Sequence, residues 1–189
     1  MTSKPPISRQ IILVTGPASS GKSEWAETLA TQTDKSVVYV ATAKVDPSDK
    51  EWQARITKHA LRRPSSWQTL SVPEELGTTI QASGPSKCLL VDSLGTWVAN
   101  LLDQDENTWE KISEDFLDSL QSSVGDVILV AEEIGWSVVP AYAAGRMFRD
   151  RLGKLVRQVG AIADSVYLVT GGHVINLSAL GTPLPRENS

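Results

Sequence analysis

The stretch that decides the fold is "IILVTGPASSGKSEWAE", residues 11–27. A β-branched run leads directly into the pattern Gly-x-x-x-x-Gly-Lys-Ser, and a helical segment follows it, as in a phosphate-binding loop. Backbone N–H groups and the helix start attract phosphate oxygens, Lys22 adds a full positive charge, and Ser23 can ligate Mg²⁺. A plain Gly/Ser-rich turn is the alternative. We expect a nucleoside triphosphate to bind at Gly16, Pro17, Ala18, Ser19, Ser20, Gly21, Lys22 and Ser23.

Composition restricts the classes of protein to which the chain can belong. Its 189 residues suffice for a single domain over 1–189, with the ends 1–9 and 181–189 loosely held. A formal net charge of −4 argues against binding to nucleic acid or to an anionic membrane surface. The single cysteine, Cys88, suits a reducing compartment, and no segment reads as a signal peptide or a membrane span. We therefore expect a cytoplasmic protein.

Short apolar runs alternate with helical patterns along the chain. Strands are expected at 11–16, 36–42, 87–93, 126–133 and 165–171, with a weaker one at 67–72 and an edge strand within 173–180. Four of these runs are almost continuously apolar, which is typical of strands buried on both faces of a parallel sheet. Helices are expected at 22–33, 48–62, 107–123 and 140–164, the last with Pro140 in its first turn. The alternation predicts a three-layer α/β fold with helices on both faces of a mostly parallel sheet.

Acidic residues end two of the expected strands. Asp92 follows the run "KCLLV" and stands where nucleotide-binding proteins commonly have a carboxylate that holds Mg²⁺. A strand-ending aspartate can also be a turn residue or a helix cap, and the phosphate loop is what favours the metal role. Glu132 and Glu133 end "VILVAEE" at a strand's carboxyl end, where α/β sheets bind ligands. They could reach a metal, a substrate hydroxyl or a neighbouring arginine.

One of the two histidines lies among arginines. His59 belongs to the expected helix "DKEWQARITKHALRRP", with Arg55 one turn before it and Arg62 and Arg63 one turn after it. Nearby positive charge disfavours the charged form of the imidazole, which keeps the ring neutral and nucleophilic, and the same arginines could hold an anionic phosphate against it. A solvated basic helix face with an incidental histidine is the alternative. The pattern by itself does not separate these two interpretations.

Longer motifs resemble one family along nearly the whole chain, about residues 11–172. The string R-I-x-x-H-x-x-x-R-P-x-x-W begins at Arg55, and the pair G-x-x-x-V-P and R-x-F-R-D-x-x-G begins at Gly135 and Arg146. With the phosphate loop, "LLVDSLGTWVANLL" and "AIADSVYLVTGG", they resemble the bifunctional adenosylcobinamide kinase / adenosylcobinamide-phosphate guanylyltransferases of cobalamin biosynthesis. These strings are far more specific than the phosphate loop.

The resemblance implies two reactions that use ATP or GTP with Mg²⁺. A nucleoside triphosphate first phosphorylates the aminopropanol hydroxyl of adenosylcobinamide, and GTP then donates GMP through a guanylyl-histidine, which matches His59. It further implies a P-loop NTPase core of RecA type and a homotrimer. Lys22 and His59 are the expected catalytic residues, and Ser23 and Asp92 the expected metal ligands. Further nucleotide contacts are expected at Ala41, Thr42, Ala43, Ala60, Leu61, Arg62 and Arg63, and contacts with the corrinoid at Glu133, Arg146, Arg149 and Asp150.

The chain departs from the family pattern at several positions. They lie in the phosphate loop, near the ends of the expected strands 67–72 and 126–133, and after the motif that begins at Arg146. The residues are Pro17, Ser19, Ser71, Glu132, Val156 and Arg157, and Ser71 concerns the expected base or ribose contacts. Guanine preference and corrinoid fit are therefore less firmly implied than phosphate binding. Two other functions remain open: a kinase that acts only on cobinamide or another small alcohol, and a non-catalytic nucleotide-binding switch.

Overall fold

Seven strands form one sheet in the computed structural model, which describes residues 9–44, 63–136 and 138–184. The strands lie in the order β3-β2-β4-β5-β1-β6-β7, and all neighbours are parallel except β6 and β7. The strands are β1 (Ile11–Gly16), β2 (Ser36–Ala41), β3 (Gln68–Ser71), β4 (Lys87–Asp92), β5 (Asp126–Glu132), β6 (Ser165–Thr170) and β7 (His173–Asn176). The helices are α1 (Lys22–Thr31), α3 (Leu76–Gln81), α4 (Leu94–Asn100), α5 (Glu106–Ser122), α6 (Ala143–Ile162) and α7 (Leu177–Leu180).

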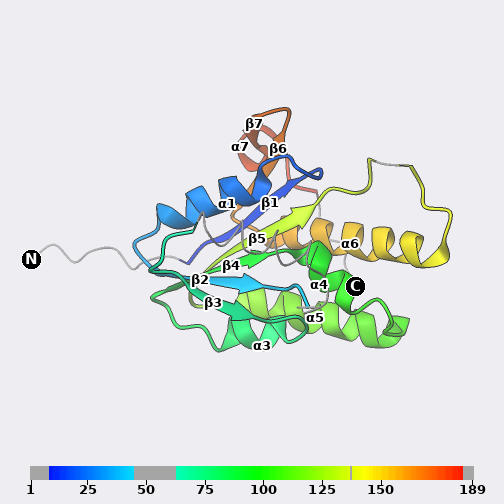
Figure 1. Ribbon diagram of the computed structural model, residues 1–189, viewed down its shortest axis with the longest axis horizontal. Coiled ribbons are helices and arrows are strands. Elements are labelled where there is room, and N and C mark those ends of the chain that lie inside the picture. The colour runs from blue at the N-terminus through cyan, green and yellow to red at the C-terminus, as the bar shows by residue number, and fades with distance from the viewer. Residues whose placement is uncertain (1–8, 45–62, 137, 185–189) are drawn as a thin grey trace, which may run out of the picture.

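Helices cover both faces of the sheet, as predicted (Figure 1). On one face α1 packs Ala26 and Ala30 against strand residues such as Val130. On the other face the larger core cluster joins the strands to α3, α4, α5 and α6, with Trp97 and Phe116 fully buried. Among the described residues, no helix has both the length and the apolar character needed to cross a membrane.

The strand order places the expected functional groups at one edge. Because β1, β2, β4, β5 and β6 run parallel, their carboxyl ends meet on the same side of the sheet. The phosphate loop leaves β1 there, and Asp92 ends β4 at the same edge. One strand, β5, separates the two and ends with Glu132.

The described strands confirm the expected ones, including the edge strand β7, whereas some helices differ. The helix expected from Pro140 begins at Ala143 instead, because Tyr142 is its extended N-cap residue. Three short helices, α3, α4 and α7, were not expected, and α7 takes up the second half of the stretch 173–180 in which an edge strand was expected. The helix expected at 48–62 lies outside the described residues.

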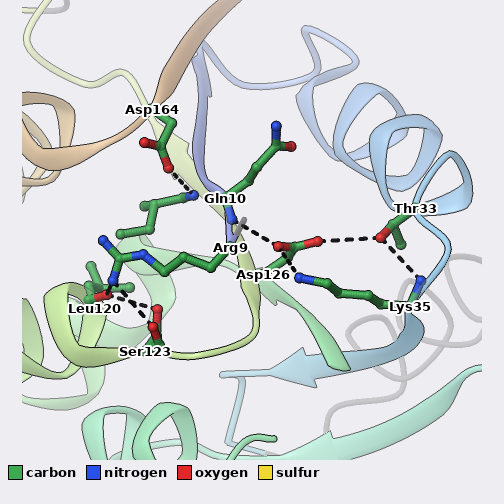
Figure 2. Close-up of polar contacts among 9 residues, drawn as sticks. Arg9, Gln10, Thr33, Lys35, Leu120, Ser123, Asp126 and Asp164 are labelled. Carbon is green, nitrogen blue, oxygen red and sulfur yellow. Dashed lines mark hydrogen bonds and ion pairs between the residues drawn. The ribbon is translucent and has the colours of Figure 1, made fainter. Parts of the chain in front are cut away.

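Polar side chains fix the chain where it enters the sheet at the opposite, amino edge (Figure 2). The carboxylate of Asp126 accepts the Gln10 backbone N–H at 2.8 Å and the Lys35 ammonium at 2.6 Å, and Asp164 accepts the Ile11 N–H at 2.7 Å. Arg9 donates to backbone carbonyls at the end of α5, including that of Ser123 at 3.3 Å. Arg9 is therefore held in place, although we expected residues 1–9 to be loosely held.

Candidate active site at the carboxyl edge of the sheet

Each glycine of the phosphate loop stands where another residue would be strained, Gly16 by close packing and Gly21 by its backbone conformation. A Cβ atom on Gly16 would lie 2.3 Å from the backbone oxygen of Val169 on β6, so only glycine fits at the end of β1. Gly21 has φ of +91°, in the left-handed region that glycine adopts without steric cost. Lys22 begins α1, is only 9% exposed, and donates from Nζ to the carbonyl oxygen of Pro17 at 3.3 Å. The loop thus curves around a lysine ammonium at a helix N-terminus.

Two serines of this loop have unusual environments. Ser19 adopts a φ of 58°, a left-handed conformation that is rare for residues other than glycine, and its side chain is exposed. The Ser20 hydroxyl is buried without a hydrogen-bond partner among the described residues. A buried hydroxyl normally has a partner, so a ligand oxygen is a fitting one at this position.

Asp92 is half-buried and its carboxylate faces β2. The Tyr39 hydroxyl donates to Oδ2 of Asp92 at 3.0 Å. Burial above all, and then the negative charge of Asp92, raise the pKa of the Tyr39 hydroxyl well above its ordinary value, so the phenol stays protonated and acts as the donor. Sequence reasoning did not single out Tyr39, because its role depends on the pairing of β2 with β4.

A hydrogen-bonded network ties the carboxyl ends of three strands together. Ser93 donates from Oγ to Oε1 of Glu132 at 2.6 Å, and Glu132 Oε2 accepts the Gly95 N–H at 3.0 Å. The Thr42 hydroxyl accepts the Ser93 N–H at 2.9 Å and donates to the Ser93 carbonyl at 2.8 Å. Asn100 donates to the Thr42 carbonyl at 2.7 Å. Glu132 therefore fixes the start of α4, rather than pairing with an arginine as one interpretation of the sequence allowed.

The string R-I-x-x-H-x-x-x-R-P-x-x-W, which we call the histidine string, is described by the structure only from Arg63 onward. His59, Ala60, Leu61 and Arg62 lie outside the described residues, whereas Arg63 is described and half-buried. Its guanidinium carbon lies 3.5 Å from the centroid of the Tyr39 ring, a short cation–π distance. The end of the string therefore lies beside the carboxyl end of β2, next to the side chain that holds Asp92.

The residues expected to contact a corrinoid surround the segment between β5 and α6. Arg149 donates to the Gly135 carbonyl at 2.7 Å, and Arg146 donates to the carbonyls of Pro140 and Ala141 at 3.1 and 2.6 Å. These two arginines brace that segment. Glu133 accepts the Gly135 N–H at 2.8 Å, and Asp150 is exposed on α6.

The segment itself carries large exposed apolar side chains. Trp136 is 66% exposed, Val138 is 90% exposed and Tyr142 is 83% exposed. Several exposed apolar side chains on one segment are a common feature of surfaces that contact another molecule.

The oxygen atoms at this edge fit a magnesium ion. In phosphate-transfer sites Mg²⁺ is held by one or two protein oxygens together with phosphate oxygens and water. Ser23 at the start of α1 and Asp92 at the end of β4 supply a hydroxyl and a carboxylate, and the Tyr39 hydrogen bond involves only Oδ2 of Asp92. The residues present therefore suit the metal that the phosphate loop implies.

Comparison with known proteins identifies close relatives over nearly the whole chain. The sequence model of one family, cobinamide kinase / cobinamide phosphate guanyltransferase, matches residues 12–177. The bifunctional adenosylcobalamin biosynthesis protein CobP of Pseudomonas aeruginosa is 37% identical, over 93% of this chain and 96% of that protein. The bifunctional adenosylcobalamin biosynthesis proteins CobU of Salmonella typhimurium and Escherichia coli are 36% and 34% identical, each over 86% of this chain and 96% of the relative.

Solved structures with the same architecture have diverged much further in sequence. A protein from Pyrococcus horikoshii OT3 superposes with a TM-score of 0.54 at 7% identity, covering 89% of this chain and 85% of that one. An ATPase from the type III secretion system of pathogenic bacteria superposes with a TM-score of 0.52 at 12% identity, covering 90% of this chain and 53% of the ATPase. At these identities the likeness concerns the fold alone, and it confirms the predicted α/β architecture, a mostly parallel sheet flanked by helices.

Proposed function

The chain belongs to the cobinamide kinase / cobinamide phosphate guanyltransferase family, and we propose that both reactions take place at its phosphate loop, Gly16–Ser23. It is a bifunctional enzyme of cobalamin biosynthesis that phosphorylates cobinamide and transfers a guanylyl group to cobinamide phosphate. The observation that carries the proposal is the loop itself, with buried Lys22 at the start of α1 and glycine at its two demanding positions.

In the kinase step, the chain's task is to hold the triphosphate and neutralise its charge. Lys22 exchanges its 3.3 Å bond to the Pro17 carbonyl for a phosphate oxygen, a stronger charge-assisted partner. Ser23 and Asp92 would hold Mg²⁺, which when bound neutralises charge on the transferring phosphoryl group. The cobinamide hydroxyl oxygen attacks the terminal phosphorus of ATP or GTP, the nucleoside diphosphate leaves, and the hydroxyl proton is released to solvent.

In the guanylyl step, His59 is the proposed nucleophile. A ring nitrogen attacks the α-phosphorus of GTP and pyrophosphate leaves; a phosphate oxygen of cobinamide phosphate then attacks the same phosphorus and releases His59. Support comes from Arg63, whose guanidinium lies against the Tyr39 ring, while the hydroxyl of the same tyrosine donates to Asp92. His59 lies four positions before Arg63 in the sequence, and a stretch of four residues spans at most about 14 Å. Arg62 and Arg63, with Ala41–Ala43 and Ala60–Leu61, are the proposed further contacts to the nucleotide.

For the corrinoid, we propose the segment between β5 and α6. Its exposed Trp136, Val138 and Tyr142 suit the apolar faces of a large macrocycle, and Arg146 and Arg149 brace its backbone. Glu133 and Asp150 are the proposed polar contacts. Replacing Trp136 with alanine should raise the KM for cobinamide and leave the KM for the nucleotide unchanged.

We also propose a cytoplasmic homotrimer, on the strength of the family resemblance. Sedimentation equilibrium tests the assembly, since a trimer has three times the chain mass of 20.4 kDa. A species with the mass of one chain at micromolar concentration would contradict it.

Quantifying both products with separate variants tests the proposed function. Wild type incubated with cobinamide, ATP, GTP and Mg²⁺ should form cobinamide phosphate and then cobinamide-GDP. Lys22→Ala should form neither product, and His59→Ala should stop at cobinamide phosphate. Lys154→Ala, at an exposed ion pair with Glu110, and His173→Ala, at an exposed histidine, are the matched controls and should form both. Cobinamide-GDP formed by His59→Ala would refute the proposed nucleophile, and a kinase-only enzyme would give no cobinamide-GDP with any variant.

A further inference from the structure

Tyr39 contacts two groups that belong to different parts of the proposed chemistry. Its hydroxyl donates to Asp92 Oδ2 at 3.0 Å, and its ring lies against the Arg63 guanidinium at 3.5 Å. Resting on the proposed function, we propose that Tyr39 is a positioning residue that sets the carboxylate of Asp92 and the guanidinium of Arg63 in one fixed arrangement. The metal-binding group and the end of the histidine string are thereby aligned by the same side chain.

Strand pairing explains why the side chain at position 39 can do this. Tyr39 pairs with Leu90, and Ala41 pairs with Asp92, so Tyr39 and Asp92 lie diagonally on neighbouring strands. Diagonal neighbours on one face are within reach of long aromatic side chains. Tyr39 is 7% exposed and belongs to the core cluster beneath α1, so the packing around its ring restricts its orientation.

The charges around Tyr39 fit a fixed donor. Asp92 and Arg63 contact it directly, and Glu27 on α1 adds a weaker negative influence on the hydroxyl. The hydroxyl donates and the carboxylate of Asp92 accepts. Since the hydrogen bond uses Oδ2, it orients the carboxylate and leaves Oδ1 outside this contact. Phenylalanine would keep the ring against Arg63 but lose the bond to Asp92, and leucine would lose both contacts.

This difference between phenylalanine and leucine defines the experiment. Calorimetric titration of GTP at a series of Mg²⁺ concentrations reports on Asp92, without requiring turnover. Because a hydrogen bond to a charged group is lost, Tyr39→Phe should raise the Mg²⁺ concentration at half-maximal GTP binding about tenfold. Tyr167→Phe is the matched control, because Tyr167 lies on β6 and packs against Trp25 on α1. The Mg²⁺ titration of this variant should match that of wild type.

Protein guanylylation at saturating Mg²⁺ reports on Arg63. Tyr39→Phe should be labelled at the wild-type rate, whereas Tyr39→Leu should be at least about tenfold slower because the cation–π contact is lost. A Mg²⁺ titration of Tyr39→Phe that coincides with wild type would overturn the proposal, and so would equal guanylylation rates for the two variants. Urea midpoints establish that the variants are folded. If wild type binds GTP but is never labelled, the proposed guanylyl step fails, while the Mg²⁺ titration still decides the role of the Tyr39 hydroxyl.

Discussion

Removing the Asp126 carboxylate should destabilise the fold strongly without affecting the active site. Asp126 is the acceptor for Lys35, for the Gln10 N–H and, at 3.4 Å, for the Thr33 hydroxyl (Figure 2). The Lys35 side chain is 5% exposed and that of Asp126 is 13% exposed, so Asp126→Ala leaves an ammonium buried without its carboxylate. Losing one partner of a buried ion pair costs about 3–5 kcal/mol, which is a large share of the stability of a domain.

Urea unfolding, followed by circular dichroism, measures this loss. With a denaturant slope of about 2.5 kcal/mol per M, a loss of about 4 kcal/mol lowers the midpoint by roughly 1.5 M. Asp118→Ala, at an exposed aspartate on α5, is the matched control and should change stability by less than about 0.5 kcal/mol. Combining Lys35→Met with Asp126→Ala removes the stranded charge and should recover a substantial part of the loss.

Asp126 lies far from the phosphate loop, so its replacement should leave nucleotide binding unchanged. Asp126 lies at the amino edge of the sheet, and the six residues of β1 separate this edge from the phosphate loop by about 20 Å. GTP affinity of folded Asp126→Ala should therefore equal that of wild type. A loss of stability below about 1 kcal/mol, or a double variant no more stable than Asp126→Ala, would refute the reasoning about the buried charge.

Three further outcomes follow from individual contacts. Gly16→Ala places a Cβ atom 2.3 Å from the Val169 oxygen, so GTP affinity by calorimetry should fall about tenfold or more, and wild-type affinity would contradict the close approach. Burial raises the pKa of the Cys88 thiol to about 12, so its titration should lower the unfolding free energy from about pH 9 to pH 12 by up to about 1.4 kcal/mol per pH unit, and urea unfolding of Cys88→Ala should lack this contribution but keep that of Tyr39, whose pKa is also raised. Glu132→Ala leaves the Gly95 N–H without its acceptor and removes the 2.6 Å partner of the Ser93 hydroxyl, so it should lower the unfolding free energy by about 1–3 kcal/mol, whereas Glu133→Ala, whose bond to Gly135 is exposed, should change it by less than about 1 kcal/mol.

Periodicity and one motif were sufficient to predict most of the fold. The apolar strands and the loop from Gly16 to Ser23 are local signals, since each depends on neighbours in sequence. The short helices carry no such signal. Gly77 and the threonines after it are poor helix formers, and α3 is held by burial of Leu76 and Ile80 instead. The helical conformation of these six residues therefore depends on tertiary packing, which sequence periodicity does not describe.

The candidate site was predictable in its groups but not in their contacts. Asp92 and Glu132 were both recognised as strand-ending carboxylates, yet one faces Tyr39 and the other holds the start of α4. This difference arises from the strand order, since Tyr39 and Asp92 lie 53 residues apart in sequence and meet only when β2 pairs with β4. Similarly, Arg146 and Arg149 were expected at the substrate, and both donate to backbone carbonyls before the helix.

The central claim is that the phosphate loop delivers GMP to His59, and covalent labelling tests it most directly. Wild type incubated with α-³²P-GTP and Mg²⁺ should retain label that is stable to base and lost in acid, as expected for a phosphoramidate. His59→Ala and Lys22→Ala should stay unlabelled, while His173→Ala should be labelled like wild type. Folded wild type without label, or His59→Ala labelled as strongly as wild type, would contradict the claim.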